Sequence, residues 1–321
     1  MNIKKKSIII PAFALLIGAS LAGSISGTVA WYQYSTRVQT AYVGVSGGKS
    51  GNLQISLDNG STWHSRLTYT DIDNYLQTNA IGQKLIPVTS GDMGKDDELP
   101  TKLYSNPIVG RAAYDDWEQA VANNYVSIPL RVRYVERTKD GNQDYLAKKL
   151  YLSDITIQKD TAINVQNADQ LNISEAVRVH VDCGGLRHLI SLNGGETLTN
   201  GKLDLDADTH ADKAYDGSDK RYGFDGGTLE EITYGEGKQT SYSKADLVVT
   251  PNDDLSLTGA TPEKVIGETK ADANGVDMTL TIWVEGWHAF DETADYPSLW
   301  NSKYIDASFD VGLEFAVNPE E

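Results

Sequence analysis

The chain has 321 residues and a formal net charge of -17, and these values already argue against some classes of function. Nucleic-acid binding needs clustered basic residues that replace the counterions on phosphate, whereas this chain has 28 basic and 45 acidic residues. A hydrophobic content of 40% is enough for a packed core. The single cysteine, Cys183, has no intrachain disulfide partner, so stability must come from the core, a bound metal or association between subunits.

The first segment, residues 1–30, has the parts of a secretory signal: three lysines, then an apolar run, then small residues. Small residues allow cleavage after Ala22 or after Ala30, and cleavage after Ala30 is preferred. An uncleaved membrane anchor stays open as the alternative, because residues 7–30 carry no charge and roughly 20 apolar residues span a bilayer. Both interpretations place residues 31–321 outside the cytoplasm, extracellular or at the cell surface.

Apolar and polar residues alternate with a period of two through much of the remaining chain, which predicts half-buried strands. The clearest case is residues 305–317, where the odd-numbered positions are apolar. Cys183 follows another such run and is interpreted as a buried structural thiol. The further predicted strands are 53–57, 126–134, 147–157, 176–181 and 276–284.

Helical patterns are few, and short helices are expected at 70–76 and 111–123. Regular strands with helices confined to connections predict an all-β fold, an antiparallel β-sandwich or jelly roll over residues 31–321, as one domain or two β modules. Segments 204–243 and 250–275 lack periodicity and are predicted to be long insert loops.

One acidic segment has the ligand spacing of a calcium loop. Asp204, Asp206, Asp208 and Asp212 occupy relative positions 1, 3, 5 and 9, from which carboxylates can converge on a hard cation. Threonine replaces the usual glycine at position 6, and tyrosine replaces the bidentate glutamate at position 12. Calcium binding and a solvated acidic loop both remain open, and no other cofactor is expected.

Motifs for catalysis are missing from the sequence. It has no Gly-x-Ser-x-Gly elbow and no phosphate-binding glycine loop after a strand, so no enzymatic activity is predicted. A turn at Gly184 and Gly185 would bring His180 and His188 together across a hairpin, although a core or surface role is favoured over zinc ligation.

Aromatic residues with a polar group are abundant: 17 tyrosines and 6 tryptophans against 5 phenylalanines, which favours rings at surfaces and interfaces. Residues 31–45 combine such rings with strong β-propensity, and a strand needs a sheet edge for its backbone groups. This segment is either the first strand of its own sheet or a strand donated to a neighbouring subunit. The residues assigned to self-assembly are Trp31, Tyr32, Tyr34, Val38 and Tyr42.

Several segments resemble the exported camelysin and TasA type of biofilm-fibre protein, which depends on a dedicated signal peptidase. They are the lysine-rich leader running into Gly27-Thr28-Val29-Ala30-Trp31-Tyr32, residues 51–57, the pair 149–152 and 174–179, and residues 280–287 with the closing strand. The resemblance implies a secreted, non-catalytic jelly-roll subunit that polymerises by lending its N-terminal segment to the next copy. Camelysin has been described as a protease, but this chain lacks a His-Glu-x-x-His motif.

The leading hypothesis is therefore a fibre or surface-layer subunit whose partner is another copy of itself. One alternative is a jelly-roll virion (capsid) protein of a membrane-containing phage, with the uncleaved leader in an internal membrane. Another is a surface carbohydrate-binding module, in which Trp283, Trp287 and Trp300 supply stacking faces. Core packing is favoured for these tryptophans. No nucleic-acid partner is expected, and membrane contact is expected only through an uncleaved leader.

Overall fold

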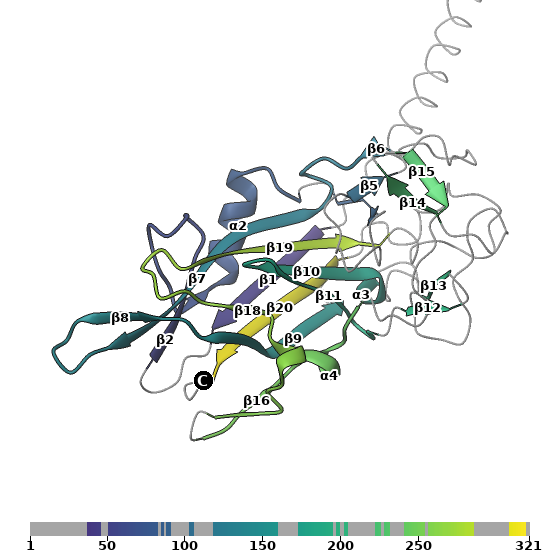
Figure 1. The fold of residues 1–321 in the computed structure, drawn as a ribbon. Helices are drawn as coiled ribbons and strands as arrows, with labels where there is room; N and C mark the ends of the chain where they lie inside the picture. Colours follow the sequence, from purple (N-terminus) through teal and green to yellow (C-terminus); the bar gives the residue numbers. More distant parts are fainter. Residues whose placement is uncertain are drawn as a thin grey trace, which may run out of the picture. The chain divides into compact units, whose positions relative to one another are not determined.

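A computed structural model gives the fold of the chain (Figure 1). It describes residues 37–45, 51–82, 85–86, 88–90, 103–105, 118–159, 173–194, 197–199, 202–204, 222–225, 228–231, 241–253, 256–285 and 308–318. The predicted leader lies outside these residues. Among the described residues, no helix has both the length and the apolar character needed to cross a membrane.

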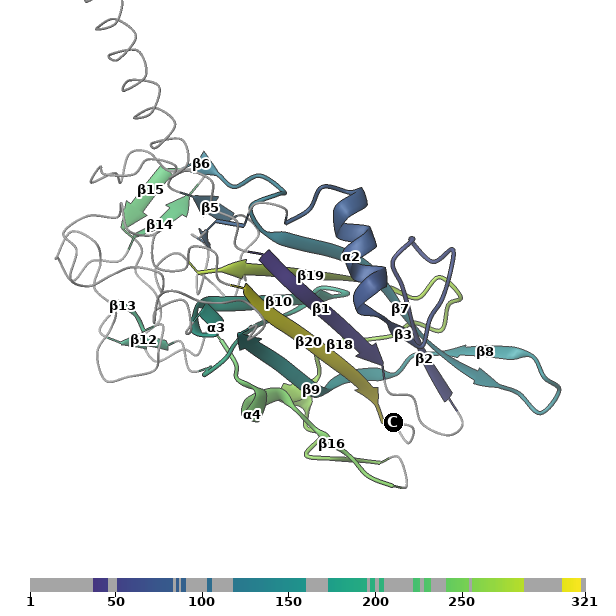
Figure 2. The same cartoon turned by 180° about the vertical axis from the view of Figure 1, so that it is seen from behind.

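Two large sheets contain most of the described strands. Sheet 1 has the order β18-β9-β20-β1-β3, and sheet 2 has the order β11-β10-β19-β7-β2 with β8 paired to β7. Every described pair in these sheets is antiparallel except β1 and β20, which run parallel (Figure 2). The strands of sheet 1 are β1 (Arg37–Val45), β3 (Arg66–Leu67), β9 (Lys149–Lys159), β18 (Gly267–Glu268) and β20 (Ser308–Val317). The strands of sheet 2 are β2 (Gly51–Ser56), β7 (Val126–Arg137), β8 (Gln143–Leu146), β10 (Val177–Cys183), β11 (Leu186–Ser191) and β19 (Val276–Val284).

One apolar core takes side chains from both sheets, and the period-two alternation decides which. The odd positions of β20 from Phe309 to Val317 are buried in this core, as are the even positions of β19 from Val276 to Val284. Full burial of each such side chain contributes roughly 1.5–3 kcal/mol. The all-β prediction and the predicted strands in sheets 1 and 2 are confirmed.

The other face of sheet 2 is covered as well. Val177, Val179 and Val181 of β10 belong to the main core, while Arg178 and His180 are also buried although they alternate with them. A second, smaller cluster lies on this outer face, and its members are Val88, Leu103, Ala120, Leu189 and Trp283. A strand covered on both faces loses the alternation of exposure that a one-sided strand has.

Helix α2 (Tyr69–Thr78) confirms the helix predicted at 70–76. It begins at a capping box, because the Thr68 hydroxyl accepts a hydrogen bond from the Asp71 N–H and the Asp71 carboxylate accepts one from the Thr68 N–H. Ile72 and Leu76 lie one turn apart and are buried in the main core. The remaining described helices are short: α3 (Ile173–Ala176), α4 (Lys244–Leu247) and the 3-10 helix η2 (Pro262–Lys264).

The helix predicted at 111–123 is wrong over its described part. Residues 118–123 hold strand β6 (Glu118–Gln119) and then a turn, in which Val121 N–H donates to the Asn124 side chain. Strand β6 pairs with β5 (Leu103–Ser105), which also pairs with β4 (Thr89–Ser90). Burial of Ala120 in the second cluster and pairing with β5 therefore override local helix propensity.

The segment 250–275 is not the irregular insert that was expected. It contains the hairpin of β16 (Thr250–Pro251) and β17 (Leu257–Thr258), then η2, then β18 at the edge of sheet 1. The Thr269 hydroxyl donates to the Leu146 carbonyl at 2.7 Å. Elements of two or three residues are too short to produce a periodic pattern, which is why sequence alone did not reveal them.

Parts of the segment 204–243 also form strands. A hairpin joins β14 (Tyr222–Asp225) and β15 (Thr228–Glu231), and Asp204 ends β13 (Lys202–Asp204), which pairs with β12 (Thr197–Thr199). Near its end, Tyr242 bonds to β11 through backbone groups. The described residues of this insert therefore include short strands, and the rest of the predicted loop lies outside the described residues.

Candidate functional site

Strand β1 contains the described part of the segment assigned to self-assembly. It pairs with β20 of its own chain from Arg37↔Ser308 to Val45↔Phe315, so in this structure it is an internal strand (Figure 2). Val38 and Tyr42 are in this strand, opposite Phe309 and Gly312. Trp31, Tyr32 and Tyr34 lie outside the described residues.

The register of β1 on β20 matches apolar residues with apolar residues. Val38 pairs with Phe309, and Ala41 pairs with Val311. Along β1 the two paired residues are three positions apart, whereas along β20 they are only two positions apart. A bulge at Gln39 absorbs the extra residue. Without it, all later positions of β1 would meet β20 out of phase, because a one-residue slip moves every side chain to the other face.

The attachment of β1 to the rest of the fold is unusual. Its two ends lead to residues 1–36 and to the linker Ser46-Gly47-Gly48-Lys49-Ser50, which joins it to β2 in the other sheet. On its outer side, the described partner β3 covers only Val43 and Gly44. Strands β1 and β20 are far apart in the sequence and are brought together by pairing, while helix α2 also contacts β1.

The acidic loop is only partly described. Asp204 is paired with Thr197 in the β12–β13 hairpin, whereas Asp206, Asp208 and Asp212 lie outside the described residues. Within the described part of the chain, no group of three histidine, cysteine or acidic side chains is arranged to hold a metal ion. The calcium interpretation stays a prediction.

Trp283 is not a ligand-stacking surface, which corrects that assignment. Its side chain is 0% exposed, and its indole N–H donates to Glu285 Oε2 at 3.0 Å. It lies in the second cluster, opposite Arg178 in the β10–β19 pair. Core packing, the favoured reading, holds for Trp283, while Trp287 and Trp300 fall outside the described residues.

His180 and His188 lie on neighbouring strands but do not meet. His180 is opposite Leu189 and His188 is opposite Val181, so the two imidazoles project from opposite faces of sheet 2. They cannot share one zinc ion in this arrangement.

Cys183 is the buried structural thiol that the sequence indicated. It is 1% exposed, and burial raises the pKa of its thiol to about 12. It contacts Gly267 of β18, because a Cβ built on Gly267 would lie 2.3 Å from the Cys183 Sγ. This close approach holds the edge of sheet 1 against β10 of sheet 2.

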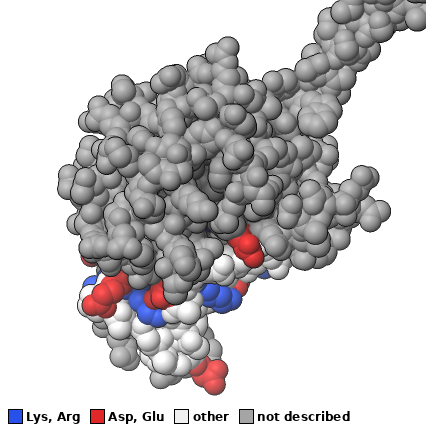
Figure 3. Space-filling model, turned by 90° about the vertical axis from the view of Figure 1, so that its right-hand side faces the viewer, with Lys and Arg blue, Asp and Glu red and all other residues white. Residues whose placement is uncertain are grey.

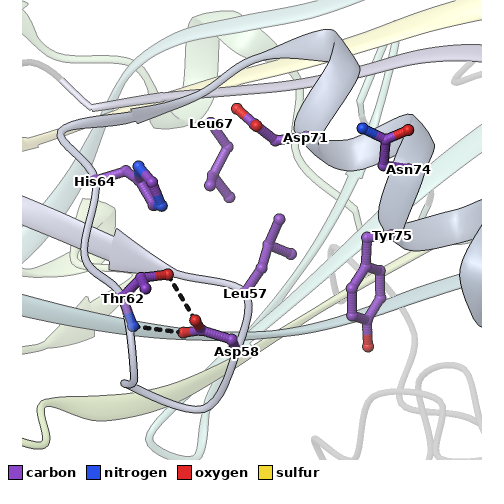
Figure 4. Close-up of a pocket in the computed structure, with 8 residues that line it drawn as sticks. All are labelled: Leu57, Asp58, Thr62, His64, Leu67, Asp71, Asn74 and Tyr75. Carbon is purple, nitrogen blue, oxygen red and sulfur yellow. Dashed lines mark hydrogen bonds between the residues drawn. The ribbon is translucent and has the colours of Figure 1, made fainter.

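A pocket of about 410 Å³ lies between the loop after β2 and helix α2 (Figure 4). The Asp58 carboxylate accepts hydrogen bonds from Thr62 Oγ1 at 2.6 Å, Thr62 N–H at 2.8 Å and Ser56 Oγ at 2.7 Å, and these bonds lower its pKa to about 2. The lining residues are Leu57, Asp58, Thr62, His64, Leu67, Asp71, Asn74 and Tyr75.

The second carboxylate of this pocket, Asp71, has its pKa lowered by hydrogen bonds from Thr68, and burial raises the pKa of Tyr75. Both carboxylates thus stay ionised while they close a turn and cap a helix, which is a structural role. Sequence reasoning missed the pocket, although Ser56-x-Asp58 and Thr68-x-x-Asp71 are readable turn and capping patterns.

On the small described part of the face shown in Figure 3, basic and acidic side chains lie close together. Among the described residues, Arg131 Nε and Asp277 Oδ1 form an ion pair at 2.9 Å. Comparison with family models, curated proteins and solved structures finds no match for this chain.

Proposed function

We propose that this chain is a secreted, non-catalytic structural subunit with a jelly-roll-like sandwich, which self-assembles into extracellular fibres or a surface layer by exchanging β1 between copies. The observation that carries the proposal is the attachment of β1: a parallel strand against β20, held on the other side by two residues of β3. Parallel neighbours need a crossover connection, and here that connection is the whole intervening chain.

Exchange is nearly neutral in contact energy. The same backbone hydrogen bonds and the same apolar register form whether β1 comes from its own chain or from an identical neighbour, which is the general basis of domain swapping. The equilibrium between closed monomers and strand-exchanged assemblies then depends on protein concentration. A strand joined by a short linker has an effective concentration in the millimolar range, so exchange needs subunits crowded to a similar level.

The linker sets the geometry of an assembly. Between Val45 and Gly51 the chain spans six Cα steps, which reach at most about 20 Å when extended. This length crosses the roughly 10 Å between packed sheets within one subunit. It also restricts exchange to neighbours in direct contact.

A disulfide experiment tests exchange directly. Tyr42 and Gly312 are paired across β1 and β20, and adjacent strands bring paired Cα atoms to about 4.8 Å, within disulfide range. Protein carrying Tyr42→Cys is mixed with protein carrying Gly312→Cys, assembled and oxidised. A disulfide-linked pair of the two chains is expected, and native Cys183 does not interfere because it is buried.

The double variant Tyr42→Cys/Gly312→Cys, called the lock, can form a disulfide between β1 and β20 of the same chain. Oxidised as a monomer it holds β1 against its own β20, and it should form filaments by electron microscopy only after reduction. The matched control is Tyr42→Cys/Thr156→Cys. Thr156 is on β9, which pairs with the other edge of β20, so it lies two strand spacings from β1 and cannot form this disulfide. Filaments from the oxidised lock would refute exchange, and no assembly of the unmodified chain at millimolar concentration would refute self-assembly itself.

Complementation in trans gives a second test. A variant lacking residues 31–45 should not form filaments, and a synthetic peptide of those residues should bind its exposed β20 edge. A peptide with Ala41→Asp and Val43→Asp is the control, because both positions pair with buried residues of β20, Val311 and Leu313. Filaments from the truncated protein would count against the proposal.

A further inference from the structure

In the β10–β11 hairpin, two histidines each have one buried ring nitrogen with no hydrogen-bond partner among the described residues. His180 is 7% exposed, and its Nε2 atom is buried with no hydrogen-bond partner among the described residues. The same holds for Nδ1 of His188. In acid both nitrogens of an imidazole carry a proton, so each of these two buried nitrogens is then a donor without an acceptor.

The surroundings of His180 do not favour a positive charge. Asp182, on the same face of β10, already accepts hydrogen bonds from Arg187 Nε at 3.0 Å and from the Gly185 N–H at 3.1 Å. Burial lowers the pKa of His180 to about 4, Asp182 opposes this shift, and Arg187 and His188 add to it. On the same face, Arg178 also lies along β10 and Glu285 follows β19, both fully buried.

His188 lies on the opposite face, toward the main core, and its ring packs against Tyr242 with 5.9 Å between centroids. Burial lowers its pKa, with no charged group contributing to the shift. Tyr242 also forms the outer seam of sheet 2, because its N–H donates to the Leu189 carbonyl at 2.9 Å and its carbonyl accepts from the Ser191 N–H at 3.1 Å.

We propose that the β10–β11 hairpin is an acid-sensitive edge of sheet 2, in which protonation of His180 and His188 opens the seam between β11 and residues 241–243. Strand β11 is the terminal strand of the sheet, whereas β10 keeps seven residue pairs with β19. Opening uncovers Leu189 and Ile190, both 0% exposed in the closed form, together with an unpaired strand edge. Such an edge is a surface to which another chain can add a strand.

The pKa of His180 sets the upper limit of the effect. Full exposure of its ring in the open form would favour that form on the order of 50- to 100-fold at about pH 4.5. His188 adds to this effect in the same direction. At about pH 7.5 both rings are neutral and the seam is closed.

Hydrogen exchange followed by mass spectrometry on the full chain tests the proposal, with protection factors corrected for the intrinsic pH dependence of exchange. Between about pH 7.5 and about pH 4.5, amides of residues 186–191 and 241–243 should lose protection by tenfold or more. Amides in the β7–β19 pair should change less than about twofold. The double variant His180→Gln/His188→Gln should lose the response, and His64→Gln, which alters an exposed histidine, should keep it.

Equal protection at both pH values would overturn the proposal, as would a simultaneous loss across all strands or a response that persists in the double variant. If that variant does not fold, an NMR titration of the unmodified protein decides. Two imidazoles that titrate below the ordinary histidine range support the proposal, and titration of all histidines near the ordinary value overturns it.

Discussion

The contact between Gly267 and Cys183 allows a sharp prediction about how the two sheets are held together. A Cβ added at Gly267 would lie 2.3 Å from Cys183 Sγ and 2.7 Å from its Cβ, both closer than real side-chain contacts. Retreat of β18 is opposed by backbone hydrogen bonds from Ile266 N–H to the Leu150 carbonyl and from Thr269 N–H to the Lys148 carbonyl, both 2.9 Å. The variant Gly267→Ala must therefore strain one sheet or the other.

Overpacking of a well-packed core typically lowers the free energy of unfolding by about 1–3 kcal/mol, and this contact is tight enough for the upper end of that range. Each kcal/mol lowers the melting temperature of a large domain by roughly 2–4 °C, so a loss of about 6–12 °C is expected for Gly267→Ala. Urea denaturation gives the free energy, and a thermal scan by circular dichroism gives the temperature.

A double-mutant cycle separates this clash from other effects. Cys183→Ala removes the sulfur atom, so the double variant Gly267→Ala/Cys183→Ala should be more stable than the sum of the two single changes predicts, by about 1 kcal/mol or more. The control is Gly141→Ala, where no atom lies within 4 Å and only the positive φ of 83° resists the change. A Gly267→Ala variant within about 0.5 kcal/mol of the unmodified protein, or strict additivity in the cycle, would refute the reasoning.

Three further predictions concern acid, capping and calcium. The folded pKa of His180 lies below its unfolded value of 6.5, so the stability that this group contributes is complete above about pH 6.5 and is lost as the pH falls toward 4. In urea denaturation, His180→Gln should therefore reduce the acid-induced loss of unfolding free energy by about 3 kcal/mol, and an unchanged pH profile would contradict this. Thr68→Ala should lower the free energy of unfolding by about 1 kcal/mol because it deletes the capping box of α2, whereas the neighbouring Thr70→Ala should change it by less than about 0.5 kcal/mol; equal losses would count against the cap. If Asp204, Asp206, Asp208 and Asp212 bind calcium, calcium at a hundred times the dissociation constant should raise the free energy of unfolding by about 2.7 kcal/mol and raise the melting temperature. Chelator should reverse the rise, and the absence of any shift would support the solvated-loop interpretation.

Local sequence patterns were enough to predict the long strands and one helix. The alternation in β7, β19 and β20 follows from one face meeting the core, and the capping residues of α2 stand beside an apolar i, i+4 pair, Ile72 and Leu76. The helix expected at 111–123 failed over its described part, where the turn after Gln119 and the burial of Ala120 depend on residues distant in the chain.

The expectation that His180 and His188 meet across the hairpin conflicts with the pairing that the turn itself imposes. A two-residue turn at Gly184 and Gly185 pairs Cys183 with Leu186, and counting outward places His180 opposite Leu189. Because side chains alternate between the two faces along each strand, this pairing puts His180 and His188 on opposite faces, and the sequence of the turn is enough to show it.

By itself, the sequence determined the strand-rich character of this protein, the positions of its longest strands and the burial of its single thiol, because each depends on a repeat of two residues or on local chemistry. Only the tertiary structure decided that β1 runs parallel to β20, that Trp283 is enclosed and that Gly267 meets Cys183. These features join residues far apart in the chain, and local periodicity carries no information about which distant strand, or which face of it, a residue will meet.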